Sequence, residues 1–171
     1  MSIHQSHGQH IENVHLQTYT SEQHFWDVLY RHQYSKLLKK ATEFLDATGG
    51  PGDDVMIFIR FGFTILSISD LDPISRIQSS CGMDACEHEY ESMSRHNRKV
   101  PTSFYYRFAC HTTAISDVYA RGRIVSVLEG GYSDRALISG AMAHLSGLVD
   151  APLQCKVDEE WWNMENLIKV I

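Results

Sequence analysis

The chain has 171 residues, of which 43% are hydrophobic and 21% are charged, so it is long and apolar enough to fold around one modest core. Fifteen Lys and Arg side chains stand against 21 Asp and Glu, which leaves a net charge of −6. Phosphate backbones and anionic lipids attract clustered cations, so this balance disfavours direct nucleic-acid or membrane binding. The composition also excludes a coiled coil, a collagen-like chain and wholesale disorder.

The cysteines and the N-terminus indicate a reducing compartment. No Cys-x-x-Cys pair occurs, and we expect reduced thiols at all four positions, which are Cys81, Cys86, Cys110 and Cys155. The first ten residues lack a basic region followed by an apolar core, so we expect no secretion signal. The longest apolar stretch, 55–68, contains Arg60 and is shorter than the roughly 20 residues of a membrane helix. We therefore expect a soluble protein.

The first predicted helix begins near Thr20 and ends at about Ala47. Thr20 and Gln23 stand in capping-box register. Apolar residues then recur every three or four positions, which predicts one buried stripe made of Phe25, Trp26, Leu29, Leu37, Leu38, Ala41, Phe44 and Leu45. A glycine-rich turn at 49–52 ends the helix.

Strands and helices alternate in the rest of the chain. Residues 54–59 and 123–128 are short apolar runs typical of strands buried on both faces. Helices are predicted from Pro101 to Gly122, from Ser133 to about Leu148, and over 158–171, whereas 61–80 shows no clean period. This alternation favours an α/β fold with a mostly parallel sheet covered by helices, whose ligand sites lie beyond the C-terminal strand ends.

Two glycines and a tyrosine follow the second predicted strand directly. Gly130 and Gly131 allow a tight turn and close approach of a ligand, and the Tyr132 hydroxyl at the strand tip can donate to a developing oxyanion. The alternative is a plain turn beside a half-buried aromatic ring. Asp84 is a second polar residue predicted near a strand end, and its alternative is a solvated loop carboxylate.

Two motifs carry a resemblance to a known enzyme family. They are the Leu-Glu-Gly-Gly-Tyr run at 128–132 and CGMDACEHE at 81–89. The first resembles a signature of the zinc-dependent histone deacetylases of class II, and the second resembles their Gly-Phe-Asp-Ala segment, with Met83 in place of Phe. SMSRHNRKVPTSFY at 92–105 is especially similar to fungal HOS-type enzymes, and NVHLQTY at 13–19 also fits that subgroup. The resemblance covers most of 11–149.

This resemblance implies a fold, an activity and a site. It implies an incomplete three-layer α/β/α domain of the arginase/deacetylase kind over 1–171, and hydrolysis of N6-acetyl-lysine with Zn²⁺. Asp84 resembles a zinc ligand, Tyr132 resembles the oxyanion tyrosine, and Gly130 and Gly131 would line the substrate tunnel. Acetylated histones or other acetyl-lysine proteins, and corepressors, are the implied partners, in the nucleus or cytoplasm.

The chain departs from the family pattern in two places. It contains no His-His pair and no Asp-any-His, so two zinc ligands and the proton-transfer pair are absent from these residues, and we expect the polypeptide alone to be inactive. His4, His7 and His10 recur every three residues but nothing directs them at Asp84. Ser2, Ile3 and His4 weakly resemble the Ser-any-His strand end of the family.

The second departure is the stretch 60–80, which separates the first predicted strand from the Asp84 motif. In the family this strand runs almost directly into the motif. We therefore interpret 60–80 as an insertion, either an unspliced intron or drifted sequence, and the alternative is a genuine loop with short elements of its own.

Three functional readings follow. The first is a lysine deacetylase represented by its C-terminal half. The second is a non-catalytic deacetylase-like remnant or interaction protein, and the third is an unrelated α/β binding module. A half-domain would also expose an apolar sheet edge and helix faces.

Overall fold

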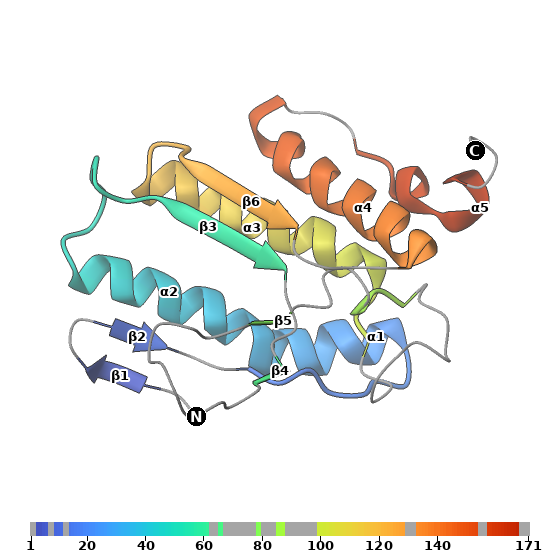
Figure 1. Cartoon of the computed structure of the whole chain (residues 1–171), viewed down its shortest axis with the longest axis horizontal. Coiled ribbons are helices and arrows are strands. Elements are labelled where there is room, and N and C mark those ends of the chain that lie inside the picture. The colour runs from blue at the N-terminus through green and yellow to red at the C-terminus, as the bar shows by residue number, and fades with distance from the viewer. Residues whose placement is uncertain are drawn as a thin grey trace.

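The computed structural model describes residues 3–6, 9–11, 14–61, 65–66, 78–79, 85–87, 99–128, 133–153 and 157–167. In chain order its elements are β1 (Ile3–Ser6), β2 (Gln9–Ile11), α1 (Glu22–His24), η1 (Phe25–Tyr34), α2 (Ser35–Ala47), β3 (Ile57–Phe61), β4 (Ile65–Leu66), β5 (Gln78–Ser79), α3 (Thr102–Tyr119), β6 (Ile124–Leu128), α4 (Asp134–Leu153), η3 (Glu159–Trp162) and α5 (Met164–Leu167) (Figure 1). The chain is thus a mixture of helices with a small parallel sheet, as the alternation predicts.

The first predicted helix is one continuous helical stretch made of α1, η1 and α2. Its cap lies one residue later than predicted, because the Ser21 side chain accepts the backbone N–H of His24 at 3.1 Å. Thr20 instead donates its backbone N–H to the His24 ring at 3.2 Å. The middle section, η1, is π-helical, which the apolar spacing does not predict. The stretch ends as expected, with positive φ at Gly49 and Gly50.

Strands β3 and β6 form a parallel pair, which confirms the predicted direction of the sheet. Their register runs from Ile57 opposite Ile124 to Phe61 opposite Leu128. β3 begins three residues later than predicted, because the preceding segment is bonded to a side chain rather than to a strand. The Arg123 guanidinium donates to the carbonyl oxygens of Gly52 and Val55 at 2.7 and 3.1 Å.

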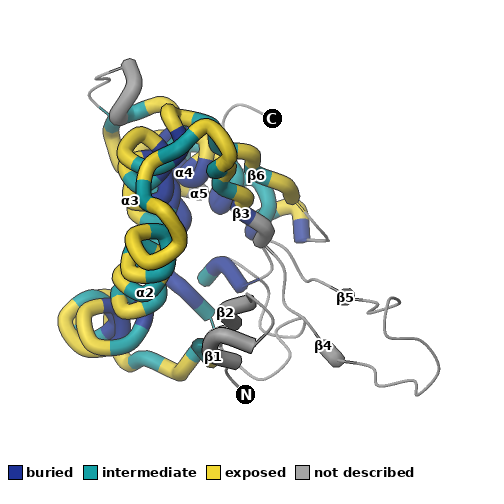
Figure 2. Tube along the Cα trace, turned by 90° about the vertical axis from the view of Figure 1, so that its left-hand side faces the viewer, coloured by how far each residue is buried: buried dark blue, intermediate teal, exposed yellow. Residues whose placement is uncertain are grey.

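The helices α3 and α4 lie to one side of this sheet (Figure 2). Ile59 on the covered face is 3% exposed, whereas Phe58 on the other face is 66% exposed, and Val125 and Val127 are each 40% exposed. The prediction that both strands are buried on two faces is therefore wrong for the described residues, in which no helix packs on the second face. The described part forms two layers.

Close packing between α3 and α4 holds the helical layer together. A Cβ atom added at Gly147 of α4 would meet the backbone carbonyl of Tyr106 and would lie 2.7 Å from the Ala109 Cβ on α3. Glycine is therefore required for this approach. α3 ends with Arg121 and Gly122 at positive φ, near the predicted end, and α4 extends five residues beyond the predicted Leu148.

An aromatic cluster joins the first helical stretch to α3. Phe25 is fully buried and contacts the rings of Tyr19, Trp26 and Tyr34, and that of Phe104, at centroid distances of 5.2 to 5.9 Å. These edge-on and tilted contacts are favourable arrangements for aromatic rings. The predicted apolar stripe is thus confirmed in its first half, while Ala41 farther along is exposed.

The N-terminal residues Ile3 and His4 lie in β1, which pairs with β2 in an antiparallel hairpin. Among the described strands β1 has no pairing with β3 or β6, and the resemblance of Ser2, Ile3 and His4 to a strand end of the family stays a prediction. Ser2 lies outside the described residues.

The segment 60–80 and the C-terminus differ in detail from the predictions. β4 and β5 pair antiparallel within 60–80, and the interpretation of this stretch as an insertion stays a prediction. At the C-terminus η3 and α5 replace the single helix predicted over 158–171, because Asn163 between them is extended. Trp162 is 4% exposed and stacks on Tyr106 at 5.1 Å, so this end packs on the core.

Two further observations concern the cysteines and the helices. Cys86 and Cys110 are free thiols as predicted, and Cys81 and Cys155 lie outside the described residues. None of the helices that the structure describes is long and apolar enough to cross a membrane.

Candidate functional site

All four sequence-predicted site residues, Asp84, Gly130, Gly131 and Tyr132, lie outside the described residues. The structure describes the chain on either side of them, at Ala85–Glu87 and at Leu128 and Ser133. The contacts of these flanking segments show which helices and strands support the chain next to the predicted site residues.

The strand and the helix predicted on the two sides of Tyr132 are confirmed as β6 and α4. β6 ends at Leu128 opposite Phe61, so the two parallel strands end at the same edge of the sheet. Five residues later Ser133 is 4% exposed; its Oγ accepts the Ala136 N–H at 3.4 Å and its carbonyl oxygen accepts the Leu137 N–H at 2.8 Å. The start of α4 is therefore capped by a buried serine.

The residues directly after Asp84 are anchored by a backbone bridge. Cys86 pairs with Val100 as a parallel β-bridge. The Val100 N–H donates to the Ala85 carbonyl at 2.8 Å, and the Glu87 N–H donates to the Val100 carbonyl at 3.0 Å. Ala85, Cys86 and Val100 are 6%, 0% and 2% exposed, so this bridge lies in the core.

Glu87 and Cys86 extend this anchor to two helices. α3 begins at Thr102, and the preceding Pro101 has no side chain that could cap the helix. The Glu87 carboxylate takes this part and accepts the Thr102 N–H at 2.7 Å. A carboxylate is favoured there by the helix dipole. The Cys86 Sγ lies 3.2 Å from the Thr102 Oγ1 and 3.5 Å from the Ser139 Oγ on α4. The segment after Asp84 and the helix after Tyr132 therefore share a buried contact.

Tyr19 and Glu87 are polar residues of this region that the sequence reasoning does not single out. Burial raises the pKa of the Tyr19 phenol above its ordinary value, and the nearby Glu87 carboxylate raises it further. Tyr19 therefore stays protonated. It closes the NVHLQTY run, which is the one sequence signal that points to it.

A buried histidine connects α4 to the sheet below the site edge. His144 is 3% exposed, and a hydrogen bond joins its Nε2 to the Ser126 Oγ of β6 at 2.7 Å. Burial lowers the pKa of His144 to about 4, although a hydrogen bond to the Tyr105 backbone acts in the opposite direction. His144 is therefore neutral at pH 7. His144 belongs to an apolar helix. The one sequence signal for its bond to Ser126 is therefore a polar residue among apolar neighbours.

No group of three or more His, Cys, Asp or Glu side chains within the described ranges could hold a metal ion. His4 and His10 lie in the N-terminal hairpin, and His7, His88 and His96 lie outside the described residues. The described residues thus do not form a zinc site by themselves.

The sequence of the chain is similar to that of a known fungal enzyme. The chain is 34% identical, over 176 aligned residues and 97% of its length, to histone deacetylase HOS3 of Saccharomyces cerevisiae. The predicted resemblance to a fungal HOS-type histone deacetylase is confirmed. The chain spans 21% of the length of that relative. A scan against models of protein families finds no match.

Proposed function

We propose that this chain is part of a zinc-dependent lysine deacetylase that hydrolyses the amide of N6-acetyl-lysine on histones or other proteins. The observation that carries the proposal is the 34% identity over 97% of the chain to a histone deacetylase. The order of β6, the Gly-Gly-Tyr residues and α4 in the chain is compatible with it, because ligand sites of parallel sheets lie beyond the C-terminal ends of the strands.

Asp84 and Tyr132 carry the proposed chemistry of this chain. Asp84 would supply a carboxylate ligand to zinc, and the Tyr132 hydroxyl would donate a hydrogen bond to the developing oxyanion of the acetamide. Gly130 and Gly131 line the tunnel for the acyl-lysine chain. When bound in the complete site, zinc supplies Lewis-acid polarisation of the carbonyl and of a water molecule.

One carboxylate does not hold catalytic zinc, because three protein ligands are the usual number. The sequence contains neither a His-His pair nor Asp-any-His, and the described residues form no metal-binding group. We therefore propose that this polypeptide is inactive alone and that the competent enzyme includes further ligands. The second candidate is a non-catalytic deacetylase-like interaction protein, which the same two observations favour.

The wider assignments rest on the same resemblance. Residues 1–171 would form part of one three-layer domain of the arginase/deacetylase kind, with an insertion at 60–80. The exposed apolar face of β3 and β6 is compatible with a further layer, since a parallel sheet is usually covered on both faces. Acetylated protein substrates and corepressor proteins would be its partners, in the nucleus or the cytoplasm.

The first experiment is a full-length transcript read covering the region before Met1 and the codons for 60–80. If the reading frame supplies a His-His pair and Asp-any-His, and 60–80 is spliced out, the enzyme proposal stands. A transcript that starts at Met1 and retains 60–80 favours the non-catalytic remnant.

The second experiment measures deacetylation of an acetyl-lysine peptide by the protein that this transcript encodes. Tyr132→Phe removes only the proposed oxyanion donor and should lower kcat by about 100-fold to 1,000-fold. Tyr119→Phe is the matched control, because it also removes one tyrosine hydroxyl. The Tyr119 hydroxyl donates to Asp46 at 2.7 Å at the C-terminal end of α3, whereas the residues that flank the predicted site contact the N-terminal end of this helix. Equal activities of the two variants would refute the role of Tyr132.

A further inference from the structure

An arginine on α3 is held in place by an aromatic ring of the first helical stretch. The Arg107 guanidinium lies 5.0 Å from the centre of a Trp26 ring. The Trp26 Nε1 donates to the Glu22 carboxylate at 3.2 Å, and this carboxylate also accepts the Ser103 hydroxyl at 2.6 Å. These bonds fix the indole against the guanidinium. Stacking on a ring leaves the N–H groups of the guanidinium edge available to a ligand, because they lie in its plane.

A histidine one turn farther along α3 is fixed by a tyrosine. A hydrogen bond of 2.5 Å joins the His111 Nδ1 to the Tyr30 hydroxyl. Burial raises the pKa of Tyr30 to about 12, and burial together with the nearby Arg107 lowers the pKa of His111, so both groups are neutral at pH 7. Within the described part of the chain the Tyr30 hydroxyl has no other acceptor, so it donates to Nδ1. The His111 Nε2 therefore carries the ring hydrogen and can donate to a ligand.

Arg107 and His111 form a donor surface on a chain whose net charge is −6. Both residues are exposed, and their spacing of four places them on one face of α3. The guanidinium edge offers two parallel N–H donors, and the His111 ring adds a third. None of the ion pairs among the described residues involves Arg107, and Asp117, the one acidic residue of α3, lies near its C-terminal end. Such a donor set suits the oxygens of a phosphate group.

The same face of α3 continues into an exposed apolar residue. Val118 lies two turns after His111 and is 61% exposed, and Ala114 between them is also exposed. The helical rise puts Val118 about 10 Å along the axis from His111, a distance that an extended peptide covers in about three residues. The face therefore matches a peptide that carries a phosphate and an apolar side chain about three residues apart.

We propose that this face of α3 binds a phosphorylated peptide segment of a partner protein, with the phosphate at Arg107 and His111 and an apolar side chain at Val118. The net negative charge of the chain disfavours nucleic acid, because most of a polyanion would face repulsive surface. Val118 also provides an apolar contact that a phosphate backbone does not use. The site does not depend on the proposed deacetylase chemistry.

The test is an NMR titration of the whole chain with a heptapeptide that has phosphoserine at its centre, leucine at both ends and alanine elsewhere. The Trp26 Nε1–H signal should shift on binding, because this indole lies against Arg107. Arg107→Gln should weaken binding about tenfold, and Arg107→Lys, which keeps the charge but loses the parallel donors, about threefold. Tyr30→Phe should weaken binding about threefold, because His111 loses the bond that orients its ring.

Val118→Ser tests the apolar contact. The unchanged chain should bind the leucine heptapeptide about threefold more tightly than a version with alanine at both ends, whereas Val118→Ser should bind the two alike. If Val118→Ser keeps the preference for leucine, the apolar part of the site is refuted.

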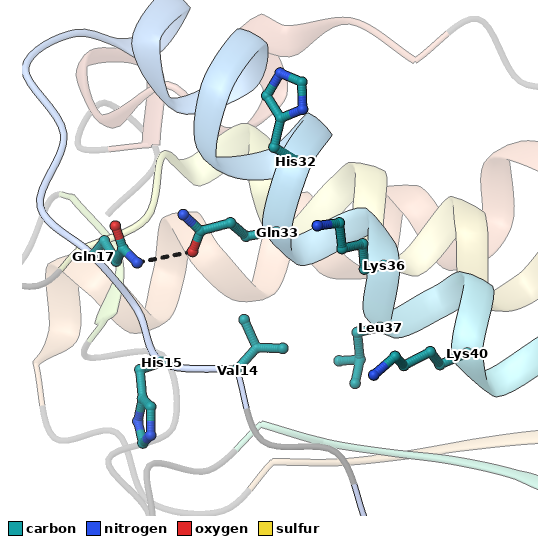
Figure 3. Close-up of a pocket in the computed structure, with 8 residues that line it drawn as sticks. All are labelled: Val14, His15, Gln17, His32, Gln33, Lys36, Leu37 and Lys40. Carbon is teal, nitrogen blue, oxygen red and sulfur yellow. Dashed lines mark hydrogen bonds between the residues drawn. The ribbon is translucent and has the colours of Figure 1, made fainter. Parts of the chain in front are cut away.

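Two control variants each remove one positive charge elsewhere. Arg121→Gln acts just past the C-terminal end of α3, where Arg121 pairs with Asp53 at 2.6 Å. Lys36→Gln changes the lining of a pocket of about 320 Å³ between α2 and the segment 14–17, which is the other place where an anion could bind (Figure 3). Both variants should bind the phosphorylated peptide like the unchanged chain.

Four results would overturn the proposal. The first is absence of measurable binding, and the second is equal binding of the same peptide without phosphate. The third is a loss of affinity in Arg121→Gln or Lys36→Gln that equals the loss in Arg107→Gln, because the phosphate would then respond to net charge or lie in the pocket. The fourth is tighter binding of a seven-nucleotide single-stranded DNA than of the peptide, which would make this face a nucleic-acid surface.

Discussion

Acidification should destabilise the chain through His144. This side chain is buried at 3% exposure, and its pKa is lowered to about 4 from an ordinary value of 6.5. Between these two values the unfolded chain binds a proton that the folded chain does not. The free energy of unfolding therefore keeps its full value above pH 6.5 and falls as the pH drops toward 4.

The size of this effect follows from the two pKa values. From pH 7 to pH 5 the His144 contribution falls by about 2 kcal/mol, and it approaches about 3 kcal/mol at pH 4. The window from pH 7 to pH 5 is the informative one, because ordinary carboxylates titrate mainly below it. Urea denaturation followed by circular dichroism measures the free energy of unfolding across this window.

Two variants separate titration from the loss of a hydrogen bond. His144→Gln removes the titrating group while it keeps a side chain that can bond Ser126, so the decline between pH 7 and pH 5 should shrink by about 2 kcal/mol. Ser126→Ala should lower stability at pH 7 by about 1 kcal/mol yet keep the decline, because His144 still titrates. If His144→Gln shows the same decline as the unchanged chain, the reasoning is wrong.

Three further predictions use the same denaturation assay or a dye. Gly147→Ala should lower the free energy of unfolding by about 1 to 2 kcal/mol, because overpacking against Tyr106 outweighs the roughly 1 kcal/mol gain in helix propensity. A more stable Gly147→Ala variant would contradict the close contact between α3 and α4. Glu87→Gln should cost about 1 kcal/mol through the weakened cap of α3, whereas the exposed Glu43→Gln should cost under about 0.5 kcal/mol; equal losses would argue against the cap. Phe58→Ser should reduce binding of a hydrophobic dye, since Phe58 is 66% exposed on the open sheet face, and a chain that binds little dye would count against that face.

Elements marked by strong local signals were predictable from the sequence. Paired glycines end the first helical stretch at Gly49 and Gly50, and Gly122 ends α3, because these positions adopt positive φ. The parallel pairing of β3 and β6 followed from the intervening helix, since a parallel connection needs a crossover. In these cases one short segment carries enough information.

Features set by distant residues were not predictable in the same way. The start of β3 depends on Arg123, whose guanidinium bonds the carbonyls of Gly52 and Val55 about seventy residues away in sequence. The burial of Phe58 was misjudged because an apolar run does not reveal whether a second helical layer covers it. The π-helical section η1 likewise has the same apolar spacing as an ordinary helix.

For the candidate site, too, the sequence predicts what local motifs carry, and the structure adds the contacts between distant residues. The resemblance to family motifs predicts roles for Asp84 and Tyr132 from the sequence, but it says nothing of the contacts that support their neighbours. The structure supplies those contacts: the Sγ of Cys86, two residues after Asp84, lies 3.5 Å from the Oγ of Ser139, which is on α4 seven residues after Tyr132, and both residues are buried.

This arrangement makes the packing of the two helices a condition for the proposed chemistry. Any change that separates α3 from α4 would also loosen the buried contact between the two flanks, although it touches neither Asp84 nor Tyr132. In the complete enzyme Gly147→Ala should therefore lower deacetylase activity together with stability, whereas Tyr132→Phe should lower activity with stability unchanged. A Gly147→Ala enzyme that is destabilised but fully active would show that the site is held by other parts of the protein.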